Sequence, residues 1–153
     1  MQISGVFLGL GEERLGQLLR GISIGKLRTY QLYERFKIRT HLAKVNTENL
    51  RKAAPRFWQR LSEHDEEFAT DLSQAILISH IEMIAEVLLF LGIPNQQGFF
   101  DKDVKAEEHL QQGWQLKVWE KFRTESNATV LLFYINHLGW EMGGETTIFL
   151  PPA

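Results

Sequence analysis

The chain contains no cysteine, which excludes a disulfide framework, a zinc site built from thiolates and a cysteine nucleophile. Its first ten residues carry no basic side chain ahead of an apolar core, so we expect no secretory signal and a cytoplasmic protein. Internal repeats and low-complexity tracts are also missing. At 153 residues the chain can remove about 70% of its unfolded surface from water, which predicts a single domain over residues 1–153.

The longest apolar run is Leu72–Leu91, in which fourteen of twenty residues are apolar and the polar ones never cluster. This pattern is typical of a buried helix, which we predict from about residue 65 to residue 91. Gly92 and Pro94 end it, since glycine adopts the left-handed conformation and proline cannot continue a helix. Two glutamates and a histidine near the middle would each cost about 2.5 kcal/mol in a bilayer, so we predict no membrane span.

Several shorter segments are expected around this helix. Residues 127–138 fit a helix or a strand, and a cap at Ser126 or Asn127 favours the helix. The sequence therefore predicts an all-α bundle of five to seven helices around the 65–91 helix, with short extended N- and C-terminal segments. The other expected segments are helices at 12–20, 27–44 and 101–123, a helix from 46 that Pro55 kinks or restarts and that breaks near Ser62, and extended residues 2–8 and 145–150.

One motif invites a catalytic interpretation. Residues 21–25 fit the G-x-S-x-G pattern of a nucleophile elbow, but an elbow follows a buried strand, and here a helix is expected before Gly21. The five histidines are not spaced as metal ligands on a helix. We therefore expect no catalytic residues, no metal and no cofactor.

Charge is distributed unevenly along the chain. Residues 1–60 hold twelve Lys or Arg and four Glu, whereas residues 61–153 hold five Lys or Arg and fifteen Asp or Glu. Either the two halves neutralise each other on folding, or the basic half binds a polyanion. If the basic half binds a polyanion, we expect nucleic-acid binding through residues 14–60, where aromatic side chains lie among the basic ones.

Helical geometry places part of this charge next to apolar residues. Because an unpaired buried charge is costly, we predict that at least one arginine, most readily Arg35, bridges Glu82 or Glu86. Alternatively, the charges line a polar cavity that binds a small acid or phosphate. The two rows concerned are Arg28, Arg35 and Arg39 on the 27–44 helix, and Asp71, Glu82 and Glu86 on the 65–91 helix.

Three further residues have two interpretations each. His80 lies on an apolar side of the 65–91 helix, where a core histidine with one hydrogen-bond partner is more frequent than a pocket residue. Phe99 and Phe100 follow a glycine in a loop, where they plug helix ends or form an exposed anchor for a partner. Plugging is the more frequent case.

The sequence predicts a non-enzymatic binding or interaction module whose partner is itself or another protein. The first alternative is a nucleic-acid binder that uses residues 14–60. The second is an enzyme that binds a small acid, a phosphate or a metal in a buried pocket of arginine, glutamate and His80.

Overall fold

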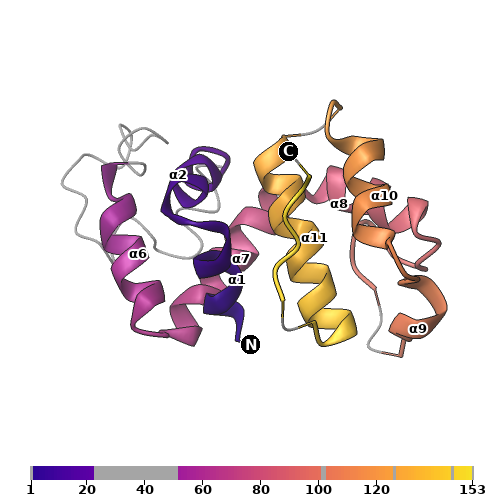
Figure 1. Ribbon diagram of the computed structural model, residues 1–153, viewed down its shortest axis with the longest axis horizontal. Helices are drawn as coiled ribbons and strands as arrows, with labels where there is room; N and C mark the ends of the chain where they lie inside the picture. Colours follow the sequence, from indigo (N-terminus) through magenta and orange to yellow (C-terminus); the bar gives the residue numbers. More distant parts are fainter. Residues whose placement is uncertain (1, 23–51, 101–102, 126, 146, 153) are drawn as a thin grey trace. The chain divides into compact units, whose positions relative to one another are not determined.

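A computed structural model describes residues 2–22, 52–100, 103–125, 127–145 and 147–152 of the chain (Figure 1). The all-α class predicted from the sequence is confirmed, and these residues form no strand. They contain seven helices of eight or more residues and one of four. The helices are α1 (Ile3–Leu10), α2 (Glu12–Arg20), α6 (Ala54–Ser62), α7 (Glu66–Ser79), α8 (Ile81–Phe90), α9 (Ala106–His109), α10 (Trp114–Phe122) and α11 (Ala128–Gly143).

The chain divides into two compact units, an N-terminal unit of residues 2–79 and a C-terminal unit of residues 80–153. The single domain expected from the chain length stays a prediction. The helix expected at 27–44 and the start of the one expected from residue 46 lie outside the described residues. Pro55 sits in the first turn of α6, which ends at Ser62, so a helix start at Pro55 and the break expected near Ser62 are confirmed.

The first helix corrects the sequence analysis, because an extended segment was expected at residues 2–8. The apolar residues Ile3, Val6, Phe7 and Leu10 recur at helical spacing, and all four are buried. They form the face through which α1 packs against α6 and α7. The segment is only eight residues long and contains glycine, so its helical period was easy to miss.

The helix expected at 65–91 is also corrected, since it is broken at His80. This residue has φ −127° and ψ 34°, outside the helical region, and separates α7 from α8. Just before the break, the Ser79 hydroxyl donates to the carbonyl of Ala75 at 2.6 Å, a bond that competes with regular helix geometry. No single helix of the described chain is long and apolar enough to cross a membrane, and α7 with α8 passes that test only as an interrupted pair.

The C-terminal unit contains α8 to α11. The helix expected at 101–123 is two helices, because Gly113 adopts a left-handed conformation with φ 82° immediately before α10. Gly92 ends α8 as predicted, with φ 73°. Helix rather than strand is confirmed for residues 127–138, although α11 continues to Gly143. Ten consecutive residues of α11, from 130 to 139, are buried, so this helix forms the centre of the unit.

The cap of α11 should make a measurable contribution to stability. The Asn127 side-chain oxygen accepts hydrogen bonds from the backbone N–H groups of Thr129 and Val130, at 3.1 and 3.2 Å. We expect Asn127→Ala to lower the free energy of unfolding by about 1 kcal/mol, as measured by urea denaturation. The exposed loop residue Gln112 is the control, and Gln112→Ala should change it by less than about 0.5 kcal/mol. An equal effect of the two substitutions would contradict the capping role.

Candidate protein-interaction site

The loop after α8 is a tight hairpin turn. Gln96 and Phe99 exchange two backbone hydrogen bonds, with N···O distances of 2.8 and 3.1 Å. The two residues between them both have positive φ, 52° for Gln97 and 91° for Gly98. Positive φ at both central positions defines a type I′ turn, which normally carries asparagine and glycine. Glutamine in this conformation is uncommon and unfavourable, so the surrounding contacts must hold the turn in place.

Two sets of contacts fix the turn. The side chain of Asn95 accepts a hydrogen bond from the backbone N–H of Gly98 at 3.1 Å and donates one to the carbonyl of Ile93 at 3.0 Å. Gly98 also packs directly on α8, where a Cβ atom on this residue would lie only 2.6 Å from Cδ1 of Ile81. The loop is therefore attached at both its base and its tip.

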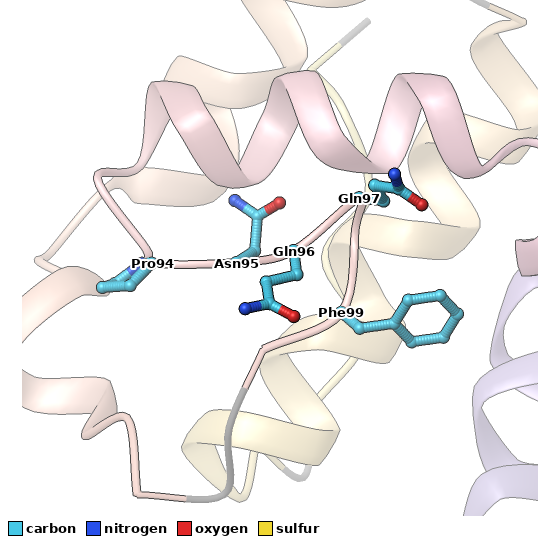
Figure 2. Close-up of a pocket in the computed structure, with 5 residues that line it drawn as sticks. All are labelled: Pro94, Asn95, Gln96, Gln97 and Phe99. Carbon is cyan, nitrogen blue, oxygen red and sulfur yellow. The ribbon is translucent and has the colours of Figure 1, made fainter.

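The turn presents an exposed aromatic side chain. Phe99 is 60% exposed, whereas the neighbouring Phe100 is half-buried. Figure 2 shows the Phe99 ring projecting away from the loop, at the side of an open pocket that Pro94, Asn95, Gln96 and Gln97 also line. This exposure does not fit the interpretation of Phe99 as a plug for helix ends. An exposed aromatic ring on a fixed backbone, with polar amides around it, has the composition of an interface anchor.

Several large hydrophobic side chains of the C-terminal unit are exposed. Every large hydrophobic side chain that is exposed among the described residues belongs to it. Single apolar residues are often exposed on a protein surface. The side chains are Leu89 and Phe90 at the end of α8, Phe99 in the turn, Leu116 on α10 and Leu150 near the C-terminus.

The acidic row predicted from the sequence is not buried. Glu82 and Glu86 are exposed and share one face of α8 with Leu89, which is 77% exposed, while Asp71 on α7 is half-buried. Because the carboxylates of Glu82 and Glu86 are exposed to solvent, they can remain charged without a cationic partner. The arginines expected opposite them, Arg28, Arg35 and Arg39, lie outside the described residues, so the bridge through Arg35 stays a prediction.

His80 does not occupy the position expected for it. It was expected on the apolar side of a continuous helix, but it is half-buried at the break between α7 and α8. The described residues contain no group of three histidine, aspartate or glutamate side chains that could hold a metal ion.

Ser4, His64 and Glu66 in the N-terminal unit superficially combine the residue types of a catalytic triad. The Ser4 hydroxyl lies 3.2 Å from Nδ1 of His64, and the Ser4 backbone N–H donates to Oε1 of Glu66 at 3.0 Å. The carboxylate thus bonds the serine backbone and does not orient the imidazole, as a triad requires. Ser4 is also fully buried, so its hydroxyl cannot reach a substrate. The cluster instead attaches α1 to the turn before α7.

A second polar cluster lies on α11. Burial lowers the pKa of His137 to about 4, and its Nδ1 lies 3.4 Å from a carboxylate oxygen of Glu141 without forming a hydrogen bond. Burial raises the pKa of Tyr134, and the charge of Glu141 raises it further, while burial also raises the pKa of Glu141 itself. Tyr134 and His137 are both over nine-tenths buried, which favours a role in stability over one in binding.

No family model, no curated protein and no solved structure matches this chain. The candidate site therefore has to be judged on its own geometry.

Proposed function

We propose that the chain is a non-enzymatic protein-interaction module, and that Phe99 is the anchor of its partner-binding surface. The observation that carries the proposal is the exposed Phe99 ring on a type I′ turn that Asn95 and Ile81 hold in place. Anchors of this kind dominate the binding energy of interfaces when their backbone is fixed before binding, because little conformational freedom is then lost.

The surroundings of Phe99 indicate the chemistry of the partner. Residues 80–153 hold five Lys or Arg and ten Asp or Glu, so the C-terminal unit carries a net charge of −5. A partner that offers an apolar pocket or side chain flanked by lysine or arginine would complement both the ring and this charge. The charge steers the encounter, and the ring supplies affinity.

The proposal can be tested with a random peptide library displayed on phage. Peptides selected on the wild-type protein should contain apolar residues flanked by basic ones. Phe99→Ala should weaken their binding about 30-fold, since a hot-spot residue contributes about 2 kcal/mol or more. Fluorescence anisotropy with the synthesised peptides gives the affinities.

A matched control is Leu116→Ala, because Leu116 is an exposed leucine of the same unit on α10. This variant should bind the selected peptides as the wild type does. Peptides that bind Phe99→Ala equally well would overturn the proposal. Binding of mixed RNA and DNA oligonucleotides that is tight, salt-resistant and unchanged in Phe99→Ala would instead assign the chain to the nucleic-acid binders.

A further inference from the structure

The C-terminal segment is held against α11 by one side chain. Residues 147–152, here called the tail, are not helical and run alongside α11 (Figure 1). Asn136, which is 6% exposed, donates from Nδ2 to the carbonyl of Phe149 at 3.0 Å. Its Oδ1 accepts from the backbone N–H of the same phenylalanine at 2.7 Å. A single amide therefore pairs with both backbone groups of one residue of the tail.

The face of α11 around Asn136 is shaped for close approach. Asn136, Gly139 and Gly143 recur at helical spacing and form what we call the tail face. A Cβ atom on Gly139 would lie 3.1 Å from Cγ of Glu145 and 3.3 Å from Cζ2 of Trp114. The missing side chain thus makes room for the chain that returns along the helix.

The turn at Gly144 directs the chain back along α11. The backbone N–H of Gly144 donates to the carbonyl of Trp140, which is the αL arrangement at a helix end, and the backbone N–H of Glu145 donates to the carbonyl of Gly139. Gly144 has φ 64°, a conformation that side-chain-bearing residues rarely adopt, although a Cβ atom there would meet nothing within 4 Å. The turn alone therefore decides whether a tail lies on its own helix.

We propose that two copies of the chain exchange their tails, so that each tail occupies the tail face of the other copy. The two hydrogen bonds between the tail and Asn136 are then the same as within one chain, and only the turn at Gly144 has to open. Exchange of an identical element between protomers is a low-cost route to a symmetric dimer.

The tail itself makes release easy. Ile148 and Phe149 are only half-buried, and Leu150 remains 50% exposed, so little apolar surface must enter water when the tail leaves. The proposal concerns a surface on α11 and does not rest on Phe99.

Sedimentation velocity of the full chain between about 5 and about 200 µM tests the exchange, because an exchanged dimer must depend on protein concentration. Gly144→Val should lower the dimer dissociation constant about tenfold or more, since valine disfavours the closed turn in each copy. Phe149→Pro removes the backbone N–H that donates to Oδ1 of Asn136, and Asn136→Leu removes the side-chain amide that binds the tail. Each of these two variants should therefore stay monomeric.

The matched control is Gly92→Val, because Gly92 also ends a helix with positive φ and has no neighbour within 4 Å of a Cβ atom. It should leave the dissociation constant unchanged, as should Phe99→Ala, which tests the proposed anchor separately. Mixing Asn136→Leu with Phe149→Pro should restore a dimer with one exchanged tail, because the first retains a normal tail and the second a normal tail face. A monomeric Gly144→Val protein over the whole range, or no dimer in the mixture, would overturn the proposal.

Discussion

Lowering the pH from 7 to 4 is expected to reduce the free energy of unfolding by about 3 kcal/mol through His137 alone. Burial lowers the pKa of this histidine from 6.5 to about 4 in the folded protein. Between these values the unfolded chain binds a proton that the folded protein does not, so stability falls as the pH decreases. A pKa difference of one pH unit corresponds to about 1.36 kcal/mol, and most of the loss of stability should occur between pH 6.5 and pH 4.

The sign of this effect distinguishes it from that of Glu141. Burial raises the pKa of Glu141, so the folded protein takes up this proton first, and the contribution of Glu141 to stability rises as the pH falls. The carboxylate is half-exposed and its contribution is correspondingly small. Glu141 therefore offsets a small part of the stability that His137 loses on acidification.

Urea denaturation of wild type and His137→Gln at a series of pH values isolates this contribution. The difference in unfolding free energy between the two proteins should change by about 3 kcal/mol across the series, because glutamine does not titrate. The His137 ring signals in an NMR titration should have their midpoint near pH 4. A midpoint near 6.5, with a difference that does not depend on pH, would show that this histidine is hydrated in the folded protein.

The sequence predicts helices best where their ends carry their own signals. The expected helix at residues 12–20 is α2 without change, since acidic residues begin it and Arg20 followed by Gly21 ends it. Asn127 and Gly92 mark their helix ends in the same local way. These signals depend on bonds between near neighbours, which a sequence displays directly.

Breaks that arise from longer contacts are harder to predict. The run at 72–91 is apolar on both sides of His80, so its pattern does not reveal that α7 and α8 are separate helices. The type I′ turn that presents Phe99 is hard to predict for a related reason, since Gln97 is an unusual residue for positive φ and the contacts of Asn95 and Gly98 that hold the turn appear only in the fold. The paired phenylalanines after a glycine are the sequence feature that points to the proposed site.

The sequence pattern does not predict the two hydrogen bonds between Asn136 and Phe149. An asparagine within a run of apolar residues is uncommon in a helix, but its partner lies thirteen residues further along the chain. Only the fold brings Phe149 back to it. The helix was expected to end before Gly139, whereas in the structure this glycine lies within α11 and leaves room for the returning chain.

The largest expected loss of stability follows from Phe57→Ala, at about 4 kcal/mol. Phe57 is completely buried in α6, and its ring lies 5.4 Å from that of Phe68 on α7. Truncation removes this contact and leaves a cavity that the surrounding core can only partly fill. Phe57→Leu should lose less than half as much, because most of the buried volume remains. The exposed neighbour Gln59 provides the control, and Gln59→Ala should change stability by less than about 0.5 kcal/mol.

The same variant tests whether the chain is one cooperative domain, as its length predicts. Amide hydrogen exchange measures protection in each unit separately. In a single domain, Phe57→Ala should reduce the protection of α11 as much as that of α6, because both units would unfold together. Loss confined to residues 2–79 would instead show two independently stable units, and would overturn the prediction of one domain. An unchanged α6 would contradict the packing role of Phe57 itself, since a cavity in its core must lower the free energy of its unfolding.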